Sequence, residues 1–591
     1  MKRSEVKEQY KWKTDDIFAS DELWEESFAE AEKSLSFSRF AGKLNNSDTL
    51  LEFFKADDKF SIALEKLAIY ANLRRDEDTA VSKYGAYYAK ICALYSKYST
   101  EQAFFAPEMA KLDESYLKSL LADKRFADYD YILKKIIKRK PHTVTEKEER
   151  LIGMAGEIFD SFIETFGKID NLELPLPEIE LEGENVKLSH GTYGIILHSD
   201  NREKRKEAYE KYYNAYTSLI NTITSVYYGN VKKDVYLSKV YKYNSCLEHA
   251  LFEEDVDRKV YDNLLKAVDD NLSSLHRYIS VRKKILGYDK LYFYDIYAPL
   301  VSGADLKLSY DDAYDYVVKG LAPLGKDYQE LLRKGYTERW LDVEETDGKR
   351  NGAYSASCPG LHPYVLLNYK PTTNDIFTIA HEMGHSLHSY FSNKYQPYAK
   401  SNYTIFVAEV ASTVNEVLLL KYMLKEAKDE NLKKYLLNYY LDSIRATLHR
   451  QAMFAEFEYG AHSMAENEEP LTKDNLCSLY AGIGKKYYGE EIEHDYNISC
   501  EWARIPHFYR AFYVYKYATG IISAINIANR ILTEGEPAVK DYYKFLCGGA
   551  STDPVSLLKL AGVDLMTTKP FEFAMAEFDK TLTEFEKSMG I

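Results

Sequence analysis

The chain has few of the residues that break helices and few that build disulfide frameworks. Its 591 residues include only 28 glycines, 15 prolines and six cysteines. No Ser/Gly-rich linker and no fixed-period repeat occurs, which excludes a flexible-linker or repeat architecture. The cysteines are scattered and lack the spacing of metal ligands, so we expect free thiols in a reducing compartment.

Long apolar runs and an excess of positive charge are also missing. No run approaches the ~20 apolar residues that span a bilayer. The start, residues 1–8, has no apolar core, so it does not predict a secretory signal. The net charge is −15, from 77 Lys+Arg and 92 Asp+Glu, which argues against nucleic acid or an anionic membrane as a partner. Together these absences predict a cytoplasmic protein.

Helix-forming residues, in contrast, are abundant, and amphipathic helical patterns recur along the chain. They cover 22–40, 48–75, 81–104, 206–240, 256–285, 308–333 and 553–589. The clearest interruption is 168–190, where two prolines and alternating Glu and Leu predict a small β element or loop. We therefore place a domain boundary near residue 200, between an N-terminal helical lobe (1–200) and a domain that carries the chemistry (201–591).

Residues 381–385, His-Glu-Met-Gly-His, are the one stretch that indicates a specific chemistry. The apolar spacing of 376–391 predicts a helix, which places His381 and His385 one turn apart, ~6 Å along the axis. Two such imidazoles can share one zinc ion, with Glu382 beside the open coordination position. Three fixed positions alone match by chance in roughly 2 of 100 such chains, so the surrounding sequence has to support the motif.

A zinc site of this kind needs a third protein ligand. His388 lies ~10 Å from His381 along the same helix, too far for three rings to converge on one ion. The extended pattern with a third histidine also fails, because Phe391 stands where that histidine is required. Glu409 is the better candidate. It lies in the strongly apolar helical stretch 403–423, where a carboxylate is costly unless it is paired or binds a metal.

Glu416 lies seven residues beyond Glu409, on the same face of the predicted helix. It has two equally supported interpretations. It can hydrogen-bond a ligand histidine and so orient the ring. It can also be an ordinary carboxylate on the helix surface.

Several stretches resemble oligoendopeptidase F, in the thimet-oligopeptidase-like (M3) family of zinc metallopeptidases. The matching stretches are His381–His385, Phe406–Thr413, Trp12–Phe18 with Trp24, Tyr243–Leu251, Gly548–Gly549 and Ala561–Asp564. They are spread over nearly the whole chain. The resemblance implies a mainly α fold, with two helical lobes that enclose a deep substrate channel and a small β-sheet beside the zinc helix. It also implies one Zn²⁺ per chain.

The family uses a histidine and tyrosines from a segment like 505–517 to bind substrate and stabilise the transition state. By this resemblance His507 matches the histidine, Tyr515 the catalytic tyrosine, and Tyr513 a further substrate contact. The aromatic run 512–517 leaves the register of the tyrosines open.

The most β-like segment, 352–369, directly precedes the zinc helix. Its first residues, Gly352, Ala353, Tyr354 and Ser355, are candidates for an edge strand. Such a strand can pair with an extended peptide through backbone hydrogen bonds. A short sheet beside the zinc does this in the family.

We therefore expect a zinc endopeptidase that cleaves internal bonds of short oligopeptides, through attack of a zinc-bound water activated by Glu382. The alternatives are a metallo-carboxypeptidase on a related helical scaffold and a catalytically inert helical peptide-binding protein. Cleavage of a peptide with a blocked C-terminus separates the first, and metal content the second. The expected partners are short peptides, not nucleic acid or membrane, and the expected state is a monomer or weak homo-oligomer.

Overall fold

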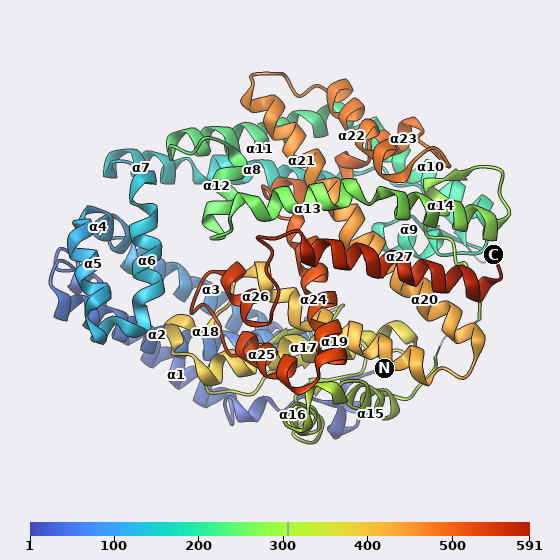
Figure 1. Ribbon diagram of the computed structural model, residues 1–591. Helices are drawn as coiled ribbons and strands as arrows, with labels where there is room; N and C mark the ends of the chain where they lie inside the picture. The colour runs from blue at the N-terminus through green and yellow to red at the C-terminus, as the bar shows by residue number, and fades with distance from the viewer. Residues whose placement is uncertain (182, 304–305) are drawn as a thin grey trace. The chain divides into compact units, whose positions relative to one another are not determined.

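A computed structural model describes residues 1–181, 183–303 and 306–591 (Figure 1). The mainly α fold is confirmed, since 72% of the chain is helical and the sheets are small. The chain forms two compact units, and each unit is assembled from three separate segments. Unit 1 comprises Met1–Thr143, Asp305–Met423 and Ser523–Val563, and unit 2 comprises Val144–Ala304, Leu424–Ile522 and Asp564–Ile591.

The boundary that we expected near residue 200 lies inside the first segment of unit 2. The chain first changes unit between Thr143 and Val144. Residues just after that point pack on much later parts of the sequence. The Phe166 ring, for example, stacks on Tyr509 with a centroid distance of 4.4 Å.

Unit 1 contains a helical N-terminal region and the helices around residues 381–385, which are called the pentad from here on. Its helices are α1 (Asp21–Ser34), α2 (Ser47–Glu77), α3 (Ser82–Gln102), α4 (Phe105–Lys111), α5 (Glu114–Ala122), α6 (Asp130–Arg139), α15 (Tyr310–Gly320), α16 (Lys326–Thr337), α17 (Thr373–Tyr395), α18 (Tyr398–Ser401), α25 (Glu536–Leu546) and α26 (Pro554–Leu560). Two further helices, α19 (Ile405–Glu426) and α24 (Tyr515–Glu534), begin in one unit and end in the other.

Unit 2 is also built largely from helices, and it contains a β hairpin within the break at 168–190, where we expected a small β element or loop. Its helices are α7 (Glu146–Met154), α8 (Gly156–Lys168), α9 (His190–Leu197), α10 (Arg202–Ser218), α11 (Ile220–Val240), α12 (Cys246–Glu253), α13 (Arg258–Asp270), α14 (Leu272–Leu286), α20 (Glu430–Ile444), α21 (Arg450–Glu466), α22 (Lys473–Tyr488), α23 (Tyr496–Ser499) and α27 (Lys569–Met589). The hairpin pairs β1 (Glu178–Leu181) with β2 (Glu184–Lys187), and β3 (Leu291–Tyr292) runs parallel to β7 (Ile492–Glu493).

The predicted ranges 48–75 and 81–104 match α2 and α3 closely, whereas 22–40 extends beyond the end of α1 at Ser34. Each later predicted range is divided into two helices. The range 206–240 is interrupted at Leu219 and the range 256–285 at Asn271. Both residues have ψ near 10°, which is outside helical geometry, at 9° and 13° respectively. Hydrophobic periodicity continues across such a break, so it does not locate the break.

A three-stranded sheet packs beside α17 in unit 1, as expected. Its order is β4-β6-β5, with β4 (Leu341–Asp342) parallel and β5 (Tyr354–Ala356) antiparallel to the central β6 (Tyr364–Leu366). Tyr364 and Leu366 of β6 also belong to the apolar core of the N-terminal helices. In this core the Trp24 ring stacks on Tyr87 at 3.9 Å. The sheet thus joins the N-terminal helices to the pentad helix, and β5 is an outer strand.

The pentad helix α17 is capped at its N-terminus by Thr372. The Thr372 side chain accepts a hydrogen bond from the backbone N–H of Asp375 at 3.2 Å. Asp375 lies in the first turn, where a negative charge is favourable to the helix dipole. Across the described ranges, no helix combines the length and the apolar character required to cross a bilayer.

Candidate metal centre and surrounding residues

The pentad helix α17 and helix α19 cross at very short range. A Cβ atom on Gly384 would lie 2.5 Å from the Cα of Ser412 and 2.8 Å from the carbonyl oxygen of Ala411. Only glycine fits there without a shift of the α19 backbone. The crossing is secured by Asn415 of α19, whose amide donates to the Ala380 carbonyl at 2.9 Å. The fourth residue of the pentad therefore allows carboxylates of α19 to reach the two histidines.

Three donor atoms meet at this crossing. His381 Nε2 and His385 Nε2 are 3.1 Å apart, and Glu409 Oε2 lies 3.4 Å from each. In a tetrahedral zinc site with ordinary bond lengths, ligand atoms are about 3.3–3.4 Å apart. The triangle therefore has the size that a tetrahedral ion requires, and three protein ligands leave one position for water or substrate. Two imidazoles and a carboxylate are a typical donor set for zinc.

Glu416 hydrogen-bonds His381, one of the candidate metal ligands, which agrees with the first of its two interpretations. Its Oε1 accepts from His381 Nδ1 at 2.5 Å. This contact directs the other ring nitrogen, Nε2, towards Glu409. Burial lowers the pKa of His381, but the carboxylates of Glu409 and Glu416 outweigh it and raise the pKa to about 10. The cluster thus concentrates negative charge that a bound cation would neutralise.

Glu382 lies between the two histidines in sequence and is 7% exposed. Burial raises the pKa of its carboxyl, and the neighbouring His381 and His385 offset part of that effect. A carboxylate with a raised pKa accepts protons more readily at neutral pH, which a general base requires.

His388 is buried and is not part of the donor cluster, in agreement with the sequence argument. Its ring stacks on Tyr403 at 3.7 Å. Burial lowers the pKa of His388 to about 3, so the ring is neutral and forms part of the unit 1 core.

The predicted edge strand is fixed to the pentad helix. The hydroxyl of Ser355 in β5 lies 2.8 Å from that of Ser386 in α17. Just before the strand, Asn368 donates to the carbonyl of Gly352 at 2.8 Å, and Ala353 follows. The Tyr354 hydroxyl donates to Asp76 at 2.9 Å, which ties the strand to α2. Pairing of this strand with a peptide stays a prediction.

In unit 2, the segment 505–517 brings one histidine and two tyrosines together. His507 lies in the short helix η12 (Pro506–Tyr509), and its ring centroid is 5.9 Å from Tyr513 and 6.0 Å from Tyr517. The two tyrosine rings are 5.6 Å apart, and the Tyr517 hydroxyl lies 3.4 Å from His507 Nε2. All three side chains are partly exposed. Burial and the nearby Arg510 lower the pKa of His507, which favours its neutral form.

Tyr515, which we expected to be the catalytic tyrosine, is placed elsewhere. It is 1% exposed, and its ring packs against Tyr261 of α13 at 5.3 Å. Burial raises the pKa of its hydroxyl far above the usual range. A side chain in the core of unit 2 does not present its hydroxyl to a substrate, so the expected register was wrong. Tyr517, in the first turn of α24, lies beside His507 instead, and it was not singled out from the sequence.

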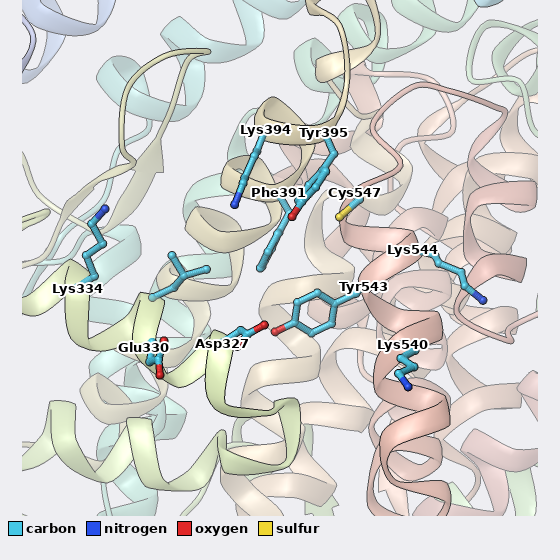
Figure 2. Close-up of a pocket in the computed structure, with 11 residues that line it drawn as sticks. Asp327, Glu330, Lys334, Phe391, Lys394, Tyr395, Lys540, Tyr543, Lys544 and Cys547 are labelled. Atoms are coloured by element: carbon cyan, nitrogen blue, oxygen red, sulfur yellow. The ribbon is translucent and has the colours of Figure 1, made fainter.

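A cavity of about 610 Å³ lies at the C-terminal end of the pentad helix (Figure 2). Its walls come from α16, α17 and α25, with lysines around aromatic side chains. The lining residues are Asp327, Glu330, Leu331, Lys334, Phe391, Lys394, Tyr395, Lys540, Tyr543, Lys544 and Cys547. The three candidate metal ligands do not line this cavity, and neither do His507, Tyr513 and Tyr517, which are called the His507 cluster from here on. The cavity is therefore separate from both groups of candidate site residues.

Two protein-family models match this chain, and both describe peptidases. Residues 195–577 match peptidase family M3, and residues 108–174 match the family described as oligopeptidase F. The chain belongs to peptidase family M3. It is therefore a metalloendopeptidase, and the His381–His385–Glu409 triangle is the group in the described residues that fits the metal of this M3 enzyme.

The curated relatives of this M3 chain extend over almost its whole length. Oligopeptidase PepF of Bacillus subtilis is 43% identical over 99% of this chain and 88% of its own length. Group B oligopeptidase PepB of Streptococcus agalactiae is 39% identical over 99% of this chain and 98% of its own.

Solved structures agree with the fold. A crystal structure from Chlamydophila abortus has a TM-score of 0.93 at 36% identity and covers 99% of both chains. The structure of oligoendopeptidase-F from Enterococcus faecium has a TM-score of 0.75 at 33% identity and covers 96% of this chain and 99% of that one.

Proposed function

We propose that this M3 chain is a zinc-dependent endopeptidase that hydrolyses internal bonds of short oligopeptides. The observation that supports this best is the triangle of His381, His385 and Glu409 donor atoms, with sides of 3.1–3.4 Å. Imidazole and carboxylate together favour zinc over calcium or magnesium, which prefer oxygen ligands.

The protein residues have distinct roles in the proposed reaction. Bound zinc would supply a Lewis acid that polarises the scissile carbonyl and lowers the pKa of water. Glu382 accepts a proton from the attacking water and passes it to the departing amine. Glu416 holds the His381 ring in the orientation and tautomer that direct Nε2 at the metal position.

The substrate is held by two groups of residues in this proposal. The edge strand β5, which begins with Tyr354 and Ser355, and the preceding Gly352 and Ala353 pair with the extended peptide backbone. His507, Tyr513 and Tyr517 donate hydrogen bonds to the substrate and to the oxygen that becomes negative in the transition state. The restriction to short peptides follows from the family resemblance. The enclosing channel, the cytoplasmic location and the monomeric or weakly associated state remain predictions.

The decisive test is the substitution Glu382→Gln. It removes the base and leaves all three donor atoms, so we expect a full metal complement and a fall in kcat of about 10³-fold or more. Metal content by mass spectrometry and turnover of a quenched peptide measure the two effects. Glu426→Gln, at the exposed end of α19, is the matched control and leaves both unchanged. Substantial turnover by Glu382→Gln would contradict its role as base.

Two further measurements test the metal and the reaction type. Glu409→Ala reduces the donor set from three to two, so the purified variant should contain little zinc. Full zinc occupancy would place the third ligand elsewhere. The native enzyme should cleave a peptide with an amidated C-terminus at internal bonds, and removal of C-terminal residues alone would support the carboxypeptidase alternative.

A further inference from the structure

The loop between η12 and α24, residues 510–514, contains a backbone conformation that is rare for a large side chain. Phe512 has φ +53°, in the left-handed region that favours glycine. The same residue is 2% exposed, so its aromatic ring lies inside unit 2. Such a conformation persists only where the surrounding contacts hold it.

One of these contacts is a hydrogen bond to the buried side chain of Glu458. The backbone N–H of Phe512 donates to Glu458 Oε1 at 2.6 Å. Glu458 lies on α21 and is completely buried. Burial raises the pKa of Glu458 to about 8, and His462 and the Phe512 N–H offset part of this rise. A buried carboxyl is costly unless it makes such bonds, so a position of this kind requires a specific partner.

The ring of Phe512 is held from the other side. It packs against His462 at 4.8 Å and against Tyr261 at 6.2 Å. His462 is itself fixed, because Nδ1 donates to the Glu458 carbonyl at 2.9 Å and Nε2 lies 3.3 Å from Asp234 of α11. Backbone and side chain of Phe512 are thus both attached to α21.

The fixed loop leads directly into the His507 cluster. Tyr513 is the next residue, and α24 begins two residues later with Tyr517 in its first turn. On the other side of the loop, Phe508 is buried against Phe457 of α21 at 5.1 Å. The direction in which Tyr513 and Tyr517 project therefore depends on how the chain turns at Phe512.

We propose that Glu458 is a positioning residue for catalysis, which acts by holding the Phe512 turn and thereby the Tyr513 and Tyr517 hydroxyls. It acts through the backbone of the loop, since its own contact is to the Phe512 N–H and not to the cluster. This inference rests on the proposed role of His507, Tyr513 and Tyr517.

Two variants of the full-length zinc enzyme separate the hydrogen bond from the shape of the side chain. Glu458→Gln keeps an acceptor oxygen, whereas Glu458→Met has similar length and no acceptor of comparable strength. We expect Glu458→Met to lower kcat roughly 10–100-fold with KM changed less than about threefold, because misplaced catalytic groups chiefly affect turnover. Glu458→Gln keeps the acceptor, so its kcat should stay within about threefold of that of the native enzyme.

Glu466→Met is the matched control on the same helix. Glu466 Oε1 also accepts from a backbone N–H, that of Cys246, at 2.5 Å, and it does not contact the loop. We expect its kcat to stay native even where its melting temperature falls. A kcat loss equal to that of Glu458→Met would overturn the proposal, because general destabilisation of α21 would explain both.

Hydrogen–deuterium exchange of the 507–517 peptide separates this inference from the proposed function. We expect faster exchange in Glu458→Met and native exchange in Glu458→Gln. Faster exchange with unchanged kcat would refute the positioning role while leaving zinc hydrolysis, which is tested by Glu382→Gln, intact. Unchanged exchange in Glu458→Met would show that Glu458 does not hold the loop.

Discussion

The three tyrosines of the segment 513–517 have different surroundings. Tyr513 and Tyr517 lie beside His507, whereas Tyr515 packs into the core of unit 2. Tyr515 and Tyr517 both lie in the first turn of α24, where residues two apart are separated by about 200° around the helix axis and so face opposite sides.

This arrangement gives a prediction for three conservative substitutions. Tyr513→Phe and Tyr517→Phe should each lower kcat about tenfold or more, since each removes a donor and keeps the ring. Tyr515→Phe is the matched control and should stay within about twofold in kcat. Steady-state kinetics on one quenched peptide measure all three. A large effect at Tyr515 alone would restore the register that the family resemblance suggested.

The candidate metal ligands could be located from the sequence, but the tyrosines that lie beside His507 could not. His381, His385 and Glu382 follow from helical spacing, and Glu409 from the cost of a carboxylate in an apolar helix. The register of the tyrosines depends on the turn at Phe512. Phe512 has a positive φ and contacts Glu458 and His462, which lie far earlier in the sequence, so no local pattern could reveal this turn.

At the scale of elements, the metal centre depends on how closely α17 and α19 approach. The contact at Gly384 is backbone against backbone, so a side chain there cannot rotate away. The apolar patterns of 376–391 and 403–423 predicted both helices. The distance between the helices follows from one glycine, whose importance is evident only once its neighbour on α19 is known.

We therefore expect Gly384→Ala to damage both stability and metal binding. Overpacking of this kind typically costs about 1–3 kcal/mol. The separation of the helices should also withdraw Glu409 from the histidines, so zinc content should fall. Gly482→Ala on α22 is the control, because a Cβ there meets no atom within 4 Å. Equal melting temperatures and zinc contents in the two variants would refute this explanation.

At the scale of the whole chain, the units could not be derived from local patterns. Periodicity identifies helices, but it does not say that Tyr364 and Leu366 complete the N-terminal core or that Phe166 stacks on Tyr509. These pairings span up to several hundred residues. The boundary near 200 was placed at a change in local composition, whereas a compact unit is defined by long-range packing.

Unit 2 contains a buried ionic network whose effect on stability depends on pH. Glu501 is 2% exposed and accepts hydrogen bonds from Arg450 at 2.7 and 3.2 Å and from Arg504 at 2.6 Å. Burial alone would raise the pKa of Glu501, but the two arginines outweigh it and hold the pKa well below the ordinary value of 4.5. The folded protein therefore keeps this group ionised at a pH where the unfolded chain binds a proton. Its stabilising contribution is complete above the ordinary pKa and is lost as the pH falls through the lower folded value.

Glu501→Gln should accordingly destabilise the protein at pH 7 and matter progressively less in acid. Loss of one partner of a buried ion pair costs about 3–5 kcal/mol, because the arginines are left without their counter-charge. Melting temperatures of the variant and native enzyme between pH 7 and pH 3 measure this effect. A difference that stays constant over that range would mean that ionisation of Glu501 does not contribute.

The close helix crossing also limits how this active site can be engineered. The third and fourth residues of the pentad, Met383 and Gly384, are buried, so packing restricts which side chains these positions accept. A mutational library aimed at altered specificity would lose most of its members if it included position 384. A zinc pentad transplanted from another peptidase, with a larger fourth residue, would need a redesigned partner helix at Ala411 and Ser412 before it could assemble.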